Sequence, residues 1–259
     1  MSLSDIVIPD LKGKAVLVTG ASTGIGAALA RAFGRQGALV GLHYNSSAEA
    51  ASMLAKEIEG AGGSTFVVKG DATKSDEMRR VVDETARTFG RLDGLINNAG
   101  GMVARVAYEE LTDAHYDAVM DLNGRSVLAA THAAIPHLKK QGGFIINTTS
   151  IAGRLGGSAG AGIYGSSKAF VASVTKGLAN ELGKYNIRVN SVAPGFIVTP
   201  FQDRYALPGQ EQQVAGMVPL KRAGTAEDCV GAYLFLSSET LSGYITGQTV
   251  DVNGGQLMP

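Results

Sequence analysis

Short apolar runs alternate with longer amphipathic segments along most of the chain. The apolar runs are too short for typical helices and read as strands buried on both faces of a sheet. These predicted strands cover residues 14–19, 38–44, 64–70, 92–98, 143–149, 187–193 and 248–253. Between them apolar residues recur with helical spacing, and the clearest predicted helices cover residues 26–36, 47–62 and 75–90.

The strand–helix–strand order repeats with short connections, which implies right-handed crossovers and a parallel, doubly wound sheet. We therefore expect an α/β fold of about seven strands with helices on both faces, built as one domain over residues 1–259. The 194–219 segment breaks this rhythm with four prolines and mixed polarity. Long irregular segments inside compact folds are often functional, so we expect a substrate lid there.

Composition excludes several classes of protein. Lys and Arg together number 23, as do Asp and Glu, so the chain lacks the basic excess of a nucleic-acid binder. The single cysteine, Cys229, rules out an intrachain disulfide and a cysteine metal cluster, and its apolar surroundings predict a buried thiol. The first residues lack the pattern of a signal peptide, and no apolar run has the length of a membrane span. We therefore expect a soluble, cytoplasmic protein with no nucleic-acid partner and no membrane contact.

A glycine-rich turn, TGASTGIG, follows the first predicted strand and opens the first helix. In a doubly wound sheet this turn faces the ligand crevice, and the helix that begins there offers free N–H groups to a pyrophosphate. Gly20, Gly24 and Gly26 permit close approach of a ligand to the backbone. Their spacing, G-x-x-x-G-x-G, differs from the common dinucleotide fingerprint, so the turn alone also fits a purely structural role.

The stretch IYGSSKAF places a phenol and an ammonium four residues apart, at Tyr164 and Lys168. On a helix the two side chains share one face, and a neighbouring cation lowers the pKa of a phenol. Such a pair suits acid–base chemistry, although the same spacing also occurs in solvated surface pairs. We expect the small residues Gly165, Ser166 and Ser167 to leave space for a ligand against the helix.

Five motifs together carry a resemblance to a known family. They are TGASTGIG (19–26), NNAG (97–100), YGSSK (164–168), the Pro194–Gly195 pair and TGQTVDVNGG (246–255). In order, spacing and strand context the chain resembles the short-chain dehydrogenase/reductase family, most of all its 3-oxoacyl-[acyl-carrier-protein] reductase group. The resemblance implies a single-domain Rossmann fold, a nicotinamide cofactor, a small carbonyl or alcohol substrate and a homotetramer. One interface of that tetramer would involve the long helices on either side of the Tyr164 segment.

The resemblance also implies a Tyr-Lys-Ser-Asn catalytic set, of which YGSSK supplies the first two members. Asn123 matches the family asparagine in the helix after NNAG. Ser150, at the end of the fifth predicted strand, matches the serine, but it lies 14 residues before Tyr164, about one more than is usual in the family. Thr149 and Ser158 therefore stay open as rivals for the serine role.

The chemistry of these side chains suits hydride transfer to and from a nicotinamide. Reduction of a ketone develops negative charge on its oxygen, which needs a proton donor within hydrogen-bond reach. Tyr164 is the expected donor, and its phenolate is the base for oxidation. We expect Lys168 to lower the pKa of Tyr164 and to hold ribose hydroxyls, and Ser150 to orient the carbonyl. Asn123 is expected to order a proton-relay water, and no metal is needed.

The end of the second predicted strand bears on the choice of nicotinamide. An acidic residue there would bind the ribose 2′-OH of NAD, but Tyr44, Asn45 and Ser46 occupy these positions. We therefore expect NADP to be preferred over NAD, although Thr23 stands where many NADP-using relatives carry an arginine. With the contacts that the resemblance adds, the predicted cofactor-binding residues are Gly20, Ser22, Thr23, Gly24, Ile25, Gly26, Tyr44, Asn45, Ser46, Asp71, Ala72, Asn98, Ala99, Gly100, Tyr164, Lys168, Pro194, Gly195, Ile197 and Thr199.

The expected function is hydride transfer between NADP or NAD and a carbonyl compound or secondary alcohol, with 3-oxoacyl thioesters among the candidate substrates. A sugar or polyol dehydrogenase of the same family is one alternative, and a nucleotide-sensing regulator without turnover is another. A lyase or epimerase would need a larger C-terminal substrate domain, for which 259 residues leave little room. Arg105, Arg154 and Arg204 lie in segments expected to wall the pocket and are candidate carboxylate clamps, although loop arginines are often only solvated.

Overall fold

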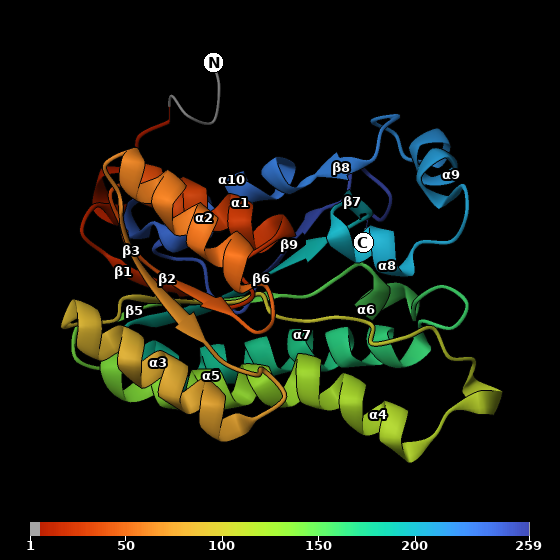
Figure 1. The fold of residues 1–259 in the computed structure, drawn as a ribbon, viewed down its shortest axis with the longest axis horizontal. Helices are drawn as coiled ribbons and strands as arrows, with labels where there is room; N and C mark the ends of the chain where they lie inside the picture. The colour runs from red at the N-terminus through yellow and green to blue at the C-terminus, as the bar shows by residue number, and fades with distance from the viewer. Residues whose placement is uncertain (1–5, 259) are drawn as a thin grey trace.

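A parallel sheet of seven strands forms the centre of the protein (Figure 1). The computed structural model describes residues 6–258. The strands are β1 (Ala15–Val18), β2 (Leu39–Tyr44), β3 (Ser64–Lys69), β4 (Gly94–Asn97), β5 (Gly143–Thr148), β6 (Ile187–Pro194) and β9 (Thr249–Val252). They pair in the order β3-β2-β1-β4-β5-β6-β9, and every pairing is parallel. The predicted α/β fold with a parallel sheet is confirmed.

Helices cover both faces of the sheet (Figure 1). One face carries α1 (Gly24–Arg35), α2 (Ala48–Gly60) and α10 (Ala226–Ser237), and the other carries α3 (Ser75–Phe89), α5 (Ser126–Leu138) and α7 (Gly162–Leu182). In α3 the residues Met78, Val81 and Val82 recur with helical spacing and are fully buried in the core. The central strands β1 and β4 are buried throughout, whereas the edge strands β3 and β9 are partly exposed.

The order of the strands reverses at β1. The chain passes from β1 to β2 and β3 on one side, then returns to place β4 on the other side of β1. At such a switch point the loops after the two strands diverge and leave a crevice at the carboxyl ends, where ligands bind in doubly wound folds. The segments that follow β1 and β4 are the glycine turn and NNAG, so the fold brings these two motifs to the same crevice.

The 194–219 segment is more regular than its composition suggests. It contains β7 (Ile197–Val198), α8 (Pro200–Tyr205) and α9 (Gln210–Met217), and β7 pairs in parallel with β8 (Gly224–Thr225). Pro200 stands in the first turn of α8, where its missing N–H costs no helical hydrogen bond. Figure 1 shows α8 and α9 beyond the tips of β6 and β9, on the side where the strands end.

Short helical elements complete the described chain. They are η2 (Pro9–Leu11), η3 (Tyr108–Glu110), α4 (Asp113–Met120), the π-helix η4 (Asp121–Arg125), α6 (Ala152–Leu155), η5 (Gly183–Tyr185) and α11 (Glu239–Ser242). Cys229 on α10 is fully buried, which raises the pKa of its thiol to about 12 and confirms the predicted buried cysteine. Within residues 6–258 no helix is long and apolar enough to span a membrane, and no cluster of three or more His, Cys, Asp or Glu side chains is placed to hold a metal ion.

Candidate active site

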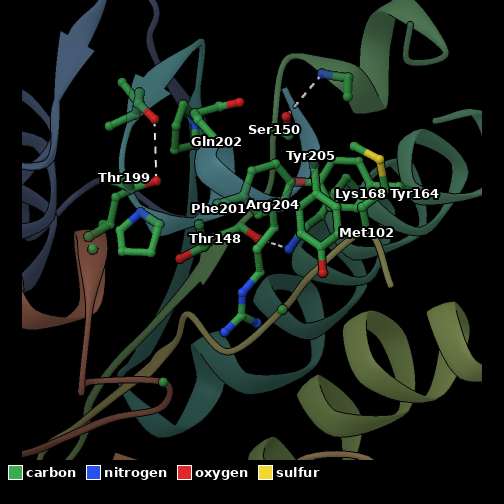
Figure 2. Close-up of a pocket in the computed structure, with 18 of the residues that line it drawn as sticks. Met102, Thr148, Ser150, Tyr164, Lys168, Thr199, Phe201, Gln202, Arg204 and Tyr205 are labelled. Carbon is green, nitrogen blue, oxygen red and sulfur yellow. Dashed lines mark hydrogen bonds between the residues drawn. The ribbon is translucent and has the colours of Figure 1, made fainter. Parts of the chain in front are cut away.

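A cleft of about 590 Å³ lies at the carboxyl ends of the strands. Its walls come from the glycine turn after β1, the NNAG loop after β4, the end of β5, the start of α7 and the 194–219 segment. Figure 2 shows Ser150, Tyr164 and Lys168 in this cleft together with side chains of α8. The fold therefore gathers, around one cavity, motifs that are far apart in the sequence.

The glycine turn has the backbone geometry of a phosphate cradle. Gly20 and Gly24 have φ angles of 64° and 56°, in the left-handed region that favours glycine. A Cβ on Gly26 would lie 2.1 Å from the carbonyl oxygen of Gly20, so only glycine lets α1 begin directly against the turn. The N-cap residue Thr23 makes no side-chain capping bond, which leaves the first N–H groups of α1 available to an anion. The turn therefore fits the pyrophosphate of a dinucleotide.

The side chain of His43 holds the glycine turn through a hydrogen bond to its backbone, a role that the sequence does not reveal. Its Nδ1 accepts a hydrogen bond from the backbone N–H of Gly20 at 3.0 Å, and its Nε2 lies 2.9 Å from the carbonyl oxygen of Gly70. These two contacts require the neutral tautomer with its proton on Nε2. Burial of the ring lowers the pKa of His43 and so favours that neutral form.

The NNAG loop holds the other side of the turn. Asn98 Nδ2 donates to the carbonyl oxygens of Thr19 and Gly20 at 3.0 and 3.2 Å. Asn97 is buried, and its Nδ2 donates to Asn147 Oδ1 of β5 at 2.9 Å. The two asparagines therefore tie β1, β4 and β5 together beneath the cleft.

Most of the predicted cofactor-binding residues line the cleft. They are Gly20, Ser22, Thr23, Gly24, Ile25, Asn45, Ser46, Ala72, Asn98, Ala99, Gly100, Tyr164, Lys168, Pro194, Gly195, Ile197 and Thr199. Gly26, Tyr44 and Asp71 are not among its lining residues. Gly26 is buried within α1, and the Asp71 carboxylate accepts hydrogen bonds from the backbone and hydroxyl of Thr73. These two residues shape the backbone beside the cleft.

Three predicted catalytic residues meet in the cleft. Ser150 follows β5, whereas Tyr164 and Lys168 stand one turn apart near the start of α7. The Ser150 hydroxyl lies close enough to the Tyr164 phenol to lower its pKa, and it accepts a hydrogen bond from the backbone N–H of Ala152 at 3.1 Å. A hydroxyl and a phenol are thus paired on the wall of the cavity.

The two rivals for the serine role have other partners. Thr149 donates its hydroxyl to the carbonyl oxygen of Val192 at 2.9 Å. Ser158 is exposed, and its hydroxyl accepts from Arg105 Nη1 at 3.1 Å. The geometry therefore favours Ser150, despite the extra residue in its spacing from the tyrosine.

The electrostatics of Tyr164 and Lys168 differ from the expectation. Lys168 Nζ donates to the carbonyl oxygen of Thr148 at 2.9 Å and lies 5.8 Å from the centre of the Tyr164 ring. Burial raises the pKa of Tyr164 to about 12, although the nearby Ser150 hydroxyl acts in the opposite direction. Burial also lowers the pKa of Lys168 to about 8. The expected lowering of the Tyr164 pKa by Lys168 is wrong for this arrangement, because desolvation of the phenol dominates. The phenol is closely surrounded by protein even though its side chain still borders the cleft.

Asn123 lies behind the cleft, fully buried in the π-helix between α4 and α5. Its Nδ2 donates to the carbonyl oxygens of Gly101 and Val119 at 2.8 and 2.9 Å, and its Oδ1 accepts from the N–H of Gly101 at 3.1 Å. Both amide N–H groups are therefore used within the protein, and the ordering of a proton-relay water by Asn123 stays a prediction. Asn123 fixes the loop after β4, where a Cβ on Gly100 would lie 2.7 Å from its Oδ1.

The small residues that follow Tyr164 serve helix packing. A Cβ on Gly165 would lie 2.8 Å from the carbonyl oxygen of Ala152 in α6. Ser167 is buried and donates its hydroxyl to the carbonyl of Tyr164 at 2.7 Å, while Ser166 is exposed. None of the three lines the cleft, so the expectation that they leave space for a ligand is wrong; Gly165 instead lets α6 approach α7.

Aromatic rings of α8 pack against Tyr164. The ring centres of Tyr164 and Phe201 are 5.6 Å apart, and those of Phe201 and Tyr205 are 4.7 Å apart in an edge-to-face arrangement. Figure 2 shows these rings clustered on one side of the cleft. The sequence gives no signal for this contact, because it joins two helices that are distant along the chain.

Arg105 connects α8 to the rest of the cleft. Its Nε donates to the carbonyl oxygen of Tyr205 at 2.6 Å, and its Nη1 donates to the carbonyl oxygen of Ala159 at 2.7 Å. Arg154 pairs with Asp251 at 2.9 Å. Two of the three candidate carboxylate clamps therefore have protein partners.

Comparison with known proteins identifies the family. Residues 20–256 match the family model described as enoyl-(acyl carrier protein) reductase. The 3-oxoacyl-[acyl-carrier-protein] reductase of Thermotoga maritima is 38% identical over 96% of this chain and 99% of its own. The chain belongs to the short-chain dehydrogenase/reductase family. Like its relatives in that family, it is an NAD(P)-dependent oxidoreductase that acts on carbonyl or alcohol groups.

Solved structures of short-chain dehydrogenases/reductases agree with this fold. The NADH-dependent reductase A1-R′, described as responsible for alginate metabolism, is 42% identical with a TM-score of 0.90, over 97% of this chain and 100% of its own. The same reductase has been solved with NAD. A short-chain dehydrogenase from Burkholderia cenocepacia, solved with NADP, is 34% identical with a TM-score of 0.88, over 95% of this chain and 98% of its own. Similar members of the family thus bind either nicotinamide cofactor.

Proposed function

We propose that the protein interconverts a carbonyl compound and the corresponding alcohol, with Tyr164 as the acid and base. One observation carries this proposal: the Tyr164 phenol borders the cleft beside Ser150, one helical turn from the buried Lys168. A phenol whose pKa is raised by burial is protonated at neutral pH. It is therefore ready to give its proton to the oxygen of a carbonyl substrate.

Each side chain around the reacting oxygen has a separate role in the proposed reaction. The nicotinamide, when bound in the cleft, supplies or accepts the hydride. Ser150 donates a hydrogen bond to the carbonyl oxygen and orients it toward Tyr164. Tyr164 gives its proton to that oxygen during reduction, and its phenolate takes the proton of the alcohol during oxidation. Lys168 has two donors besides the one that Thr148 accepts, and these suit ribose hydroxyls; Asn123 positions the loop after β4.

We also propose that NADP is preferred over NAD. Within the described part of the chain, no Asp or Glu lines the cleft, so no carboxylate there would repel a 2′-phosphate. The three residues that follow β2, Asn45, Ser46 and Ser47, do line the cleft and provide donors. We expect kcat/KM with NADPH to exceed that with NADH by more than about twofold. A smaller ratio, or a preference for NADH, would show that these donors do not select the phosphate.

The 194–219 segment is proposed as the substrate lid. Its Thr199 covers the glycine turn, because a Cβ on Gly24 would lie 3.4 Å from Thr199 Cβ. Its α8 packs an aromatic ring against Tyr164. The segment therefore touches both the cofactor end and the reaction end of the cleft, as a covering element must.

Two substrate classes are supported by relatives. The Thermotoga maritima relative is named a 3-oxoacyl-[acyl-carrier-protein] reductase, which supports a 3-oxoacyl thioester. The reductase A1-R′ is described as responsible for alginate metabolism, which supports a substrate derived from a carbohydrate.

A panel of 3-oxoacyl thioesters, sugars and small diketones separates these classes. The assay follows the absorbance of the reduced nicotinamide at about 340 nm. Turnover of at least one carbonyl is expected. If every panel member leaves the absorbance unchanged while NADPH binds, the protein is a nucleotide-binding module and the proposal fails.

A further inference from the structure

The charged side chains that line the cleft all carry the same sign. Lys168, Arg105 and Arg204 are among its lining residues, and no Asp or Glu of residues 6–258 is. The whole chain has 23 basic and 23 acidic residues, so this local excess does not follow from composition. A cleft lined by charges of one sign concentrates ligands of the opposite sign. The cavity is therefore suited to anions.

Two of these three cations are already engaged by the protein. Lys168 donates to the carbonyl of Thr148, and Arg105 donates to the carbonyl of Tyr205. Arg204 is exposed, and its guanidinium has no hydrogen-bond or ion-pair partner within the described chain. Among the three cations of the cleft, Arg204 is thus the one without a protein partner in the described chain, and it is available to an anionic ligand.

Arg204 lies on the face of α8 that also carries Phe201 and Tyr205. Phe201, Arg204 and Tyr205 are related by steps of three and four residues, so their side chains share one side of the helix. That side faces the reaction centre, because the Phe201 ring lies 5.6 Å from the Tyr164 ring. Figure 2 shows the Arg204 side chain extending from α8 into the cleft.

We propose that Arg204 binds a carboxylate of the substrate, so that the substrate pair is an oxo acid and the corresponding hydroxy acid. The assignment rests on the proposed carbonyl–alcohol interconversion at Tyr164. The planar guanidinium offers parallel donors that match the two oxygens of a carboxylate. A substrate anchored in this way has its carbonyl oriented toward Tyr164 and Ser150, whereas a neutral carbonyl compound lacks that anchor.

The phosphates of the cofactor have other binding groups in the cleft. The free N–H groups at the start of α1 fit the pyrophosphate, and Asn45 and Ser46 lie where a 2′-phosphate is expected. Arg204 comes instead from the proposed lid, beside the rings that pack on Tyr164. Its position therefore favours the substrate over the cofactor as the source of the anion.

Matched acids and amides test this assignment. The probes are pyruvate and pyruvamide, acetoacetate and acetoacetamide, and 4-oxopentanoate and 4-oxopentanamide, each assayed with NADPH. For at least one pair, kcat/KM of the wild-type protein should favour the acid by about tenfold or more. Arg204→Gln should abolish that preference, mainly by raising KM for the acid. Arg87→Gln, which removes an exposed arginine of α3 outside the cleft, should keep it.

Three results would overturn the assignment. In the first, the wild-type protein reduces neutral carbonyls but shows no preference for any acid. In the second, Arg204→Gln keeps both the acid-to-amide ratio and the NADPH affinity of the wild type. In the third, Arg204→Gln weakens NADPH binding by about tenfold or more and leaves that ratio unchanged, which would assign the guanidinium to a cofactor phosphate.

The carboxylate site and the reaction at Tyr164 are separable by binding. Calorimetry measures the affinity of 4-oxopentanoate for the NADP⁺-loaded protein, without any requirement for turnover. Arg204→Gln should weaken this binding by about tenfold. If the protein reduces no carbonyl and the binding still depends on Arg204, the proposed reaction fails and the anion site stands. If the binding is the same in both proteins, the anion site fails.

Discussion

Lys168 is buried, with only 4% of the residue exposed, and its ammonium donates a hydrogen bond to the carbonyl oxygen of Thr148. Burial lowers its pKa from 10.5 to about 8, so the folded protein binds this proton more weakly than the unfolded chain does. By linkage, the cost to stability is present in full below about pH 8 and disappears as the pH rises to about 10.5. A shift of this size corresponds to about 3 kcal/mol.

Lys168→Met should therefore stabilise the protein at about pH 7 while it impairs activity. The lost hydrogen bond to Thr148 offsets about 1 kcal/mol, which leaves a gain of about 2 kcal/mol, or about 4–8 °C in Tm. Thermal unfolding between about pH 7 and 9.5 measures the effect, and the gain should shrink as the pH rises. Lys176→Met, at an exposed position of the same helix, should change Tm little. A gain that grows with pH, or a loss of stability at neutral pH, contradicts the burial cost.

At the scale of residues, sequence motifs predict which side chains line the cleft, but not which backbone groups bind them. Ser150, Tyr164 and Lys168 line the cleft as the motifs predict, because side-chain type and spacing determine these motifs. The acceptor for Lys168 is a backbone oxygen of Thr148, so the identity of that side chain carries no signal. The contact of His43 with the glycine turn was missed for a similar reason, since the donor is the N–H of a glycine.

The element that most depends on its surroundings is α8. It has six residues, too few for a stable helix in isolation. Its position is set by the ring contact with Tyr164 and by the hydrogen bond from Arg105, which is 100 positions away from Tyr205 in the sequence. The strands of the sheet are continuous apolar runs, and α1, α2 and α3 show a helical hydrophobic period, so the sequence predicts these elements. A helix of this length shows no such period, and its partners are not local, so the 194–219 segment was expected to be irregular.

Arg105→Ala should loosen α8 without unfolding the protein. Amide hydrogen exchange in α8 should become faster, because the carbonyl of Tyr205 loses its charged donor. We expect kcat/KM to fall by about tenfold, while Tm changes by less than about 2 °C. Arg125→Ala, which removes an exposed arginine paired with Asp121, is the control and should leave the exchange in α8 unchanged. Exchange in α8 that is equally slow with and without Arg105 would show that the arginine does not anchor the helix.

The whole molecule presents apolar side chains on the outer surface of α5 and α7. Leu128 is 41% exposed and Phe170 is 37% exposed. A Cβ on Gly124, one helical turn before Leu128, would lie 3.3 Å from the Phe170 ring, so Phe170 of α7 packs beside the segment that leads into α5. Exposed apolar groups that cluster in this way often mark subunit interfaces. They support the homotetramer predicted from the sequence, with these helices in one interface.

Phe170→Asp should break the assembly, because it places a carboxylate in a surface that association would bury. Light scattering after size-exclusion chromatography should give the mass of four chains for the wild type and a smaller mass for the variant. Met53→Asp introduces the same charge at an exposed position of α2 and should keep the wild-type mass. A monomeric wild-type protein, or a Phe170→Asp variant of unchanged mass, contradicts this interface.

The function proposed for the whole molecule depends on the phenolic oxygen of Tyr164, and removal of that oxygen is the most direct test. In Tyr164→Phe the ring and its packing against Phe201 are kept, while the proton donor is lost. Turnover of a carbonyl accepted by the wild type, followed at about 340 nm, should fall by at least about a thousandfold, with NADPH affinity within about twofold of the wild type. A variant that turns over within about tenfold of the wild type would contradict the role of Tyr164 as the acid and base.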